Sequence, residues 1–324
     1  MSINRMYYGT KKIYPFLEGG NSGECNCDQE YNNGYNNGYN DGYNEGQNNC
    51  SGGGFVTDSA FEAIGWSADI VNDRLGEAFA YSLQIMNEWD NQNDSLGSKF
   101  RNNKKLVFFP AVDWTNVVYS DIMFYDCSSL VAIPDLYTPN LYLCANMFSH
   151  CSALRKAPMM NTSGVDNFYE LYNECLSLVD VPELDTSNGT IFSRMFHNCK
   201  SLKTIPSLNL SKAEETYSMF HNCENLESVP FLDVSNVQTG HYMFDSCPNL
   251  KHLGGLGGAK FDIDLGTSEE LTYESAMNVI NSVYDFNANG VEETRTIRFS
   301  GPTLSLLSDD DITTAVNKGW VISA

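Results

Sequence analysis

The chain has 324 residues, and its 41 Asp and Glu against 19 Lys and Arg give a formal net charge of −22 at pH 7. A field of this sign repels phosphate backbones, which excludes nucleic acid as a partner. No run of about 18 apolar residues occurs, so we expect no membrane insertion.

The N-terminal 54 residues fall into two parts. Residues 1–20, MSINRMYYGTKKIYPFLEGG, lack the continuous apolar segment of a secretory signal. Residues 21–54 form a Tyr/Gly/Asn-rich spacer in which YNNGYNNGYNDGYNEG repeats every four residues. This composition favours a weakly ordered spacer, and an oligomeric stalk is the alternative. Cys25, Cys27 and Cys50 flank the repeat, and both interchain disulfides and free thiols remain open.

A long helix is predicted within residues 55–92. Ser59 and Glu62 form a capping box at its start, and the pattern continues to Trp89. Apolar and small residues then recur at three- and four-residue spacing, at Phe61, Ile64, Ala68, Val71, Leu75, Ala78, Ser82, Ile85 and Trp89. Such a seam suits a parallel coiled coil, which would make the chain a homo-oligomer, or a cap on the following repeats.

The dominant feature of the sequence is a repeat of 24 residues. It places a cysteine at Cys127, Cys151, Cys175, Cys199, Cys223 and Cys247 without any insertion. An aromatic residue precedes each cysteine by three positions, at Phe124, Phe148, Tyr172, Phe196, Phe220 and Phe244. A leucine follows each by three, at Leu130, Leu154, Leu178, Leu202, Leu226 and Leu250. A degenerate first unit has Asn103 at the cysteine position.

Each unit is predicted to form one coil. It would contain a short helical or turn segment around MFxxC, a strand around LxxIPxL, and a polar corner. The corners, such as Asn161 to Ser163 and Asp185 to Ser187, place side-chain acceptors where Asx turns need them. Stacked coils would share one core, with strands about 4.8 Å apart.

The unit MFxxCxxLxxIPxLDTSxV resembles the BspA-like leucine-rich repeats, including those of mycoplasma-type surface lipoproteins, over roughly residues 99–258. The expected fold class is therefore an α/β repeat. It comprises a leucine-rich-repeat solenoid of 24-residue coils, an N-terminal long helix and a small C-terminal α/β cap at 259–324. For the cap we predict helices over 271–286 and 308–320, with Ser308 as N-cap, and a strand over 294–301.

His197 and His221 each lie two residues before a cysteine, which raises the alternative of a zinc site with Cys199 and Cys223. The cysteine position is constant in all six coils, whereas the histidine position varies. We therefore predict a buried ladder of free thiols beneath solvent-facing polar residues. We expect no metal, no cofactor and no catalytic residues, because no acid, base or nucleophile motif accompanies the histidines.

The layout around the coils, including SLQIMNEWD and KFRNNKKLVFFP, resembles repeat-bearing proteins encoded by phages of gut Bacteroidetes, such as crAss-like phages. The opening segment is similar to short N-terminal segments of phage tail and appendage proteins. The resemblance implies a virion structural protein, a head or tail fibre-type component assembled in the host cytoplasm. Residues 1–20 would anchor it to other virion proteins, and the coils would attach to a host surface protein or glycan.

The predicted binding surface uses the variable strand positions of the coils, because a regular scaffold can carry specificity there. It comprises Asp135, Met159, Glu183, Ser207 and Phe231, with Arg155, Lys203, Glu227 and Lys251 in the neighbouring column. The alternative function is a BspA-type bacterial cell-surface adhesin. The absence of an apolar segment before Cys25 counts against a lipoprotein anchor.

Overall fold

The structure, a computed structural model, describes residues 68–90 and 92–324. The anchoring segment, the spacer and the start of the long helix lie outside the described residues. The chain divides into two compact units, Met1–Glu77 and Ala78–Ala324, and all of the coils belong to the second. Helix α4 (Ala68–Glu88) crosses the boundary between the units.

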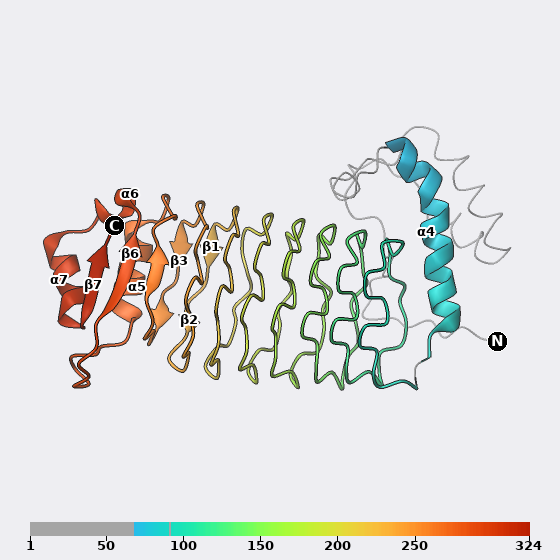
Figure 1. Ribbon diagram of the computed structural model, residues 1–324, viewed down its shortest axis with the longest axis horizontal. Coiled ribbons are helices and arrows are strands. Elements are labelled where there is room, and N and C mark those ends of the chain that lie inside the picture. Colours follow the sequence, from blue (N-terminus) through green and yellow to red (C-terminus); the bar gives the residue numbers. More distant parts are fainter. Residues whose placement is uncertain (1–67, 91) are drawn as a thin grey trace, which may run out of the picture. The chain divides into compact units, whose positions relative to one another are not determined.

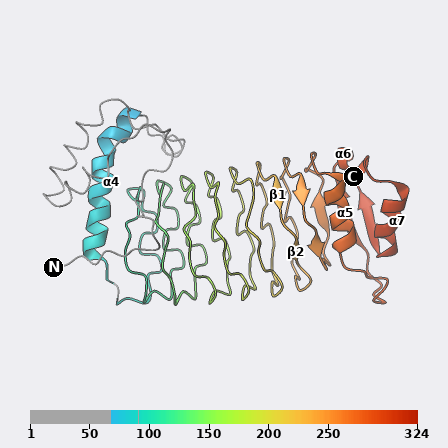
Figure 2. The same cartoon turned by 180° about the vertical axis from the view of Figure 1, so that it is seen from behind.

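The second unit is built from coils that lie side by side along one axis (Figures 1 and 2). Parallel bridges join residues 24 positions apart, as in the series Asn167 to Ile191, Ile191 to Glu215 and Glu215 to Thr239. Backbone N–H groups donate to the next coil along the chain, for example from Phe148 to the carbonyl of Leu171 at 3.0 Å. The register of the sequence repeat is therefore also the register of hydrogen bonding.

The expected fold class, an α/β leucine-rich-repeat solenoid with a helix or turn and a strand in each coil, is wrong. In the described coils the MFxxC segment is a series of turns and contains no helix. Regular strands are limited to two parallel pairs of two residues each, β1 (Ser228–Val229) with β3 (His252–Leu253) and β2 (Leu232–Asp233) with β4 (Leu256–Gly257). Elsewhere the coils are joined by isolated bridges, so they form a stack of turn-rich coils.

The absence of a helix at MFxxC has a local cause in the backbone. Two residues in each coil adopt a left-handed conformation, one and five positions before the cysteine, as at Arg194 and Asn198 with φ of 58° and 59°. A right-handed helix cannot pass through such residues. Ile122, with φ of 49°, is the β-branched member of this set, and this conformation is costly for its side chain.

A stack of aromatic rings forms the centre of the core. Neighbouring rings are nearly parallel, with centroids 5.4 to 5.7 Å apart, in the series Phe100, Phe124, Phe148, Tyr172, Phe196, Phe220 and Phe244. Each ring has no or little solvent exposure. Such contacts contribute about 0.5–1.5 kcal/mol per pair beyond the burial itself.

The cysteines form a second ladder beside the rings. All six are free and fully buried. Each thiol lies 3.0 or 3.1 Å from the carbonyl oxygen of an aromatic residue 27 positions earlier, as Cys199 does from Tyr172 and Cys223 from Phe196. The thiols are thus hydrogen-bonded within the core rather than paired with one another.

The polar corners contain the predicted Asx turns. The side chain of Asn161 accepts from the backbone N–H of Ser163 at 3.1 Å, and Asp185 accepts from Ser187 at 3.0 Å. The same bond recurs in the next two corners, from Ser211 to Asn209 and from Ser235 to Asp233. This prediction is confirmed in all four corners.

The first coil packs against residues at the end of helix α4, and against Trp89 directly after it, that belong to the same unit. Ser82 donates to the carbonyl of Phe108 at 2.7 Å, and the indole of Trp89 donates to that of Asp113 at 2.7 Å. Asn103, at the cysteine position of this coil, donates to the hydroxyl of Tyr81 at 2.7 Å. Two roles were considered for the helix, a coiled coil and a cap on the repeats, and these contacts are those of a cap. The start of the predicted coiled-coil pattern lies outside the described residues.

The other end of the stack is closed by a three-stranded parallel sheet and three helices. The sheet has the order β5 (Ile263–Leu265), β6 (Arg295–Phe299), β7 (Trp320–Ser323). The helices are α5 (Tyr273–Ser282), α6 (Gly301–Leu304) and α7 (Asp309–Asn317), and Ser308 forms a capping box with Asp311 at the start of α7. Within residues 68–90 and 92–324, no helix has the length and apolar character needed to cross a membrane.

Candidate binding site

The structure places the predicted binding residues in one row along the stack. Asp135, Met159, Glu183, Ser207 and Phe231 are all exposed, one in each of five successive coils. In the neighbouring column Arg155, Glu227 and Lys251 are half-buried and Lys203 is exposed. Two of these cations have carboxylate partners, since Lys203 lies 3.0 Å from Glu227 and Lys251 lies 2.8 Å from Glu270.

A different surface brings chemically varied side chains together. It is the column two residues before each cysteine, where His197 and His221 lie. The Nδ1 of His197 is 2.9 Å from Oδ1 of Asn173, and the two imidazoles stack with centroids 5.0 Å apart and an interplanar angle of 8°. The Nε2 of His221 lies 3.3 Å from the carboxylate of Asp245. Side chains of four successive coils are therefore in continuous contact.

The zinc alternative is not supported by this geometry. The thiols of Cys199 and Cys223 bond carbonyl groups in the core, while the imidazoles are half-buried at the surface. Among the described residues, no group of three or more His, Cys, Asp or Glu side chains is arranged to hold a metal ion.

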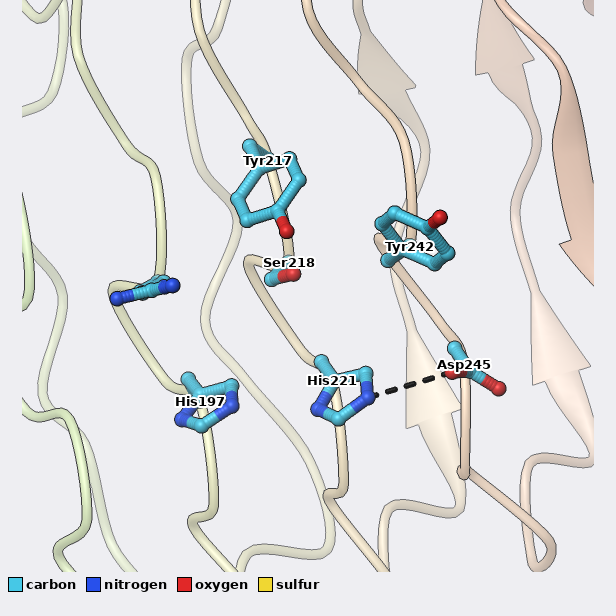
Figure 3. A pocket seen from close by; sticks show the side chains of 7 residues that line it. His197, Tyr217, Ser218, His221, Tyr242 and Asp245 are labelled. Carbon is cyan, nitrogen blue, oxygen red and sulfur yellow. Dashed lines mark ion pairs between the residues drawn. The ribbon is translucent and has the colours of Figure 1, made fainter.

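A hollow of about 340 Å³ lies over this column (Figure 3). It is lined by Arg194, His197, Tyr217, Ser218, His221, Tyr242 and Asp245. Arg194, Ser218 and Tyr242 occupy the same left-handed position in three successive coils, with φ of 52° to 60°. The repeat thus brings residues 24 positions apart to one side of the stack at consecutive levels.

The aromatic part of the hollow is formed by Tyr217 and Tyr242. Their rings are nearly perpendicular, with centroids 5.8 Å apart and an interplanar angle of 84°. Both are exposed, by 37% and 54% of their surface. The guanidinium of Arg194 lies 5.8 Å from the ring centroid of Tyr217, within the range of a cation–π contact.

The positive charge of Arg194 in the hollow is compensated locally. Arg194 lies 3.2 Å from the carboxylate of Glu170, and this hydrogen bond raises the pKa of Arg194. Burial, followed by the neighbouring His221 and Arg194, lowers the pKa of His197, so its imidazole stays neutral at pH 7. The surface therefore offers polar groups without a large excess of one charge.

Hydrogen-bonding capacity remains free in this hollow at Asp245. The Nδ1 of His221 also lacks a hydrogen-bond partner, but this atom is buried. Of the carboxylate oxygens of Asp245, one faces Nε2 of His221.

Sequence reasoning missed most of these residues. It treated the column of His197 and His221 as solvent-facing, whereas both imidazoles are half-buried and in mutual contact. Arg194, Tyr217 and Tyr242 were not singled out. The signal that could have revealed them is the run His197, His221, Asp245 in one column, since residues 24 apart become neighbours.

Comparison with known proteins bears on the same part of the chain. Residues 142–255 match the family described as Mycoplasma protein of unknown function, DUF285. The matched range includes every residue that lines the hollow. The resemblance to mycoplasma-type repeat proteins is confirmed to this extent. The chain matches no curated protein and no solved structure.

Proposed function

We propose that the chain is a structural protein of a phage virion, a head or tail appendage or fibre-type component that presents its coils for binding. The observation that carries a binding role is the hollow over residues 194–245, in which a uniform backbone displays varied side chains. Regular scaffolds with variable surface positions are suited to recognition. The virion context rests on the resemblance of the segments that flank the coils to phage-encoded proteins.

In this proposal the parts of the chain have separate roles. Residues 1–20 dock the protein to other virion proteins, and the spacer and the N-terminal part of the long helix make it a homo-oligomer. The stack of coils attaches to a host surface protein or glycan. The protein is assembled in the host cytoplasm and resides in the virion, with no enzymatic activity and no cofactor.

A second candidate is a bacterial cell-surface adhesin of the BspA type. The observation that favours it is the match of residues 142–255 to a family described from Mycoplasma, a cellular organism. The same hollow would then serve adhesion of the cell itself. The two candidates differ in where the chain resides and share the binding role.

Quantitative mass spectrometry of density-purified phage particles and of the host envelope fraction tests the proposal. We expect peptides of this chain in particles at a constant ratio to the major capsid protein, retained after a high-salt wash. A capsid protein and an abundant outer-envelope protein serve as the markers of each fraction. Recovery of the chain in the envelope fraction alone would overturn the virion role and support the adhesin.

A further inference from the structure

The side chains that line the hollow indicate a class of ligand. We propose that the hollow binds a neutral sugar ring, so that the coils recognise an uncharged glycan. This inference rests on the proposed binding function and specifies its ligand. It follows from the charges, the exposed rings, the free hydrogen-bonding groups and the size of the hollow.

The charge balance favours an uncharged ligand. Arg194 is paired with Glu170, so its charge does not require a counter-ion from the ligand. The formal net charge of −22 repels polyanionic chains. The guanidinium of Arg194 in the lining of the hollow likewise disfavours a cationic side chain. A ligand that is polar but uncharged meets neither penalty.

The exposed rings suit the C–H face of a pyranose. Such a face is apolar and packs on an aromatic ring, while the hydroxyl groups around it stay polar. The guanidinium of Arg194 already lies over Tyr217, whereas Tyr242 is 54% exposed and has no cation over its ring among the described residues. We assign Tyr242 as the ring that packs on the sugar.

The polar groups suit hydroxyls, each of which both donates and accepts. Only one carboxylate oxygen of Asp245 faces Nε2 of His221, so the second oxygen can accept from a sugar hydroxyl. Figure 3 shows Asp245 beside His221, with Tyr217 and Tyr242 adjoining them.

The size of the hollow agrees with this assignment. Its volume of about 340 Å³ lies at the lower end of the range of about 300–1,000 Å³ for small-molecule sites. A sugar ring at the end or within a chain fits a hollow of this size, with the rest of the glycan outside it. The occupant is thus one unit of a glycan.

Saturation-transfer difference NMR with the full chain tests the proposal, using lactose, maltose, cellobiose and N,N′-diacetylchitobiose as probes. Tyr242→Ala removes the packing ring, and the near-isosteric Asp245→Asn removes the carboxylate. Tyr142→Ala is the matched control, because Tyr142 is also exposed and perpendicular to a second tyrosine, Tyr119, at 6.3 Å. Thermal unfolding of each variant verifies that it is folded.

We expect transfer to at least one disaccharide, weakened about tenfold or more in Tyr242→Ala and in Asp245→Asn and unchanged in Tyr142→Ala. The proposal is overturned if no probe receives transfer, if transfer survives either substitution, or if Tyr142→Ala abolishes it equally. Location of the chain in particles by mass spectrometry does not depend on this result, so the sugar assignment can fail while the proposed function stands.

Discussion

The thiol of Cys199 donates to the carbonyl oxygen of Tyr172, 27 residues earlier, at 3.1 Å. The acceptor belongs to the residue whose ring stacks on Phe196, three positions before the donor. Each cysteine therefore joins the aromatic stack of its own coil to the backbone of the preceding coil. A small side chain with a weak donor meets this geometry, and the position is filled in the same way in all six coils.

Replacing Cys199 by alanine tests this role. The Cys199→Ala variant leaves a small void and a buried carbonyl without its donor, so we expect the free energy of unfolding to fall by about 1–3 kcal/mol. Urea denaturation followed by circular dichroism measures the change. Ser207→Ala, at an exposed position of the same coil, is the control and should change the free energy of unfolding by less than about 0.5 kcal/mol. Equal midpoints for the two variants would contradict the role.

The buried thiols predict a loss of stability in alkaline solution. Burial raises the pKa of Cys127, Cys144 and Cys247 from 9.0 to about 12. Between these values the unfolded chain ionises its thiols and the folded chain does not. The free energy of unfolding is therefore unaffected below pH 9 and falls above it, by about 1.4 kcal/mol per pH unit for each thiol.

Denaturation midpoints measured across pH 9 to 12 check this prediction. The Cys144→Ala variant should reduce the slope against pH by about one proton, because burial alone raises the pKa of this thiol. An unchanged slope in the variant would show that Cys144 does not contribute. The ladder thiols should also resist alkylation by iodoacetamide until the chain is unfolded.

The lowered pKa of His197 predicts a second dependence of stability on pH, in which stability declines as the pH falls. Its pKa is lowered from 6.5, first by burial and then by His221 and Arg194. The unfolded chain then binds more protons than the folded chain as the pH falls below 6.5, so stability is present above this pH and declines below it. His197→Asn places at this position the residue found at Asn173 one coil earlier.

We expect the decline in thermal midpoint below pH 6.5 to be smaller in His197→Asn than in the unmodified protein. His241→Asn, at an exposed position outside the lining of the hollow, is the matched control. The contribution of His197 would be refuted by parallel pH profiles for His197→Asn and the unmodified protein.

The left-handed backbone at Ile122 predicts that a substitution there stabilises the folded chain. Ile122 has φ of 49°, and Asn146 holds the equivalent position one coil later with φ of 58°. This conformation costs less for asparagine than for the β-branched isoleucine, so Ile122→Asn should raise the free energy of unfolding by about 1 kcal/mol. Thermal unfolding measures the gain, and the reverse change, Asn146→Ile, should give a loss of similar size. Destabilisation by Ile122→Asn would show that packing of the side chain outweighs backbone strain.

Contacts between residues of neighbouring coils are easier to predict from the sequence than the secondary structure of each coil. A spacing of 24 residues identifies neighbours such as Phe196 and Phe220, whose rings are stacked at 5.7 Å. It does not reveal that residues such as Glu174 and Arg194 adopt a left-handed backbone, because neither is glycine or asparagine. The fold class was therefore wrong where it required helix and strand within each coil.

The candidate site was harder to predict for a related reason. Comparison of internal coils separates constant positions from variable ones, and it assigned variable residues such as His221 to solvent. A hollow forms where the side chains of several variable residues lie next to one another, as those of Tyr217 and Tyr242 do across two coils. Such combinations are not repeated from coil to coil, so the 24-residue period carries no signal for them.

The constant register of the backbone separates the length of the stack from its recognition surface. Because each coil bonds only its neighbours, removal of one 24-residue unit before Arg194 would shorten the stack by about 4.8 Å and leave the hollow whole. Insertion of a unit between Tyr217 and Tyr242 would divide the hollow between non-adjacent coils. Duplication and deletion of units can therefore vary the reach of the protein and its specificity independently, according to where in the stack they fall.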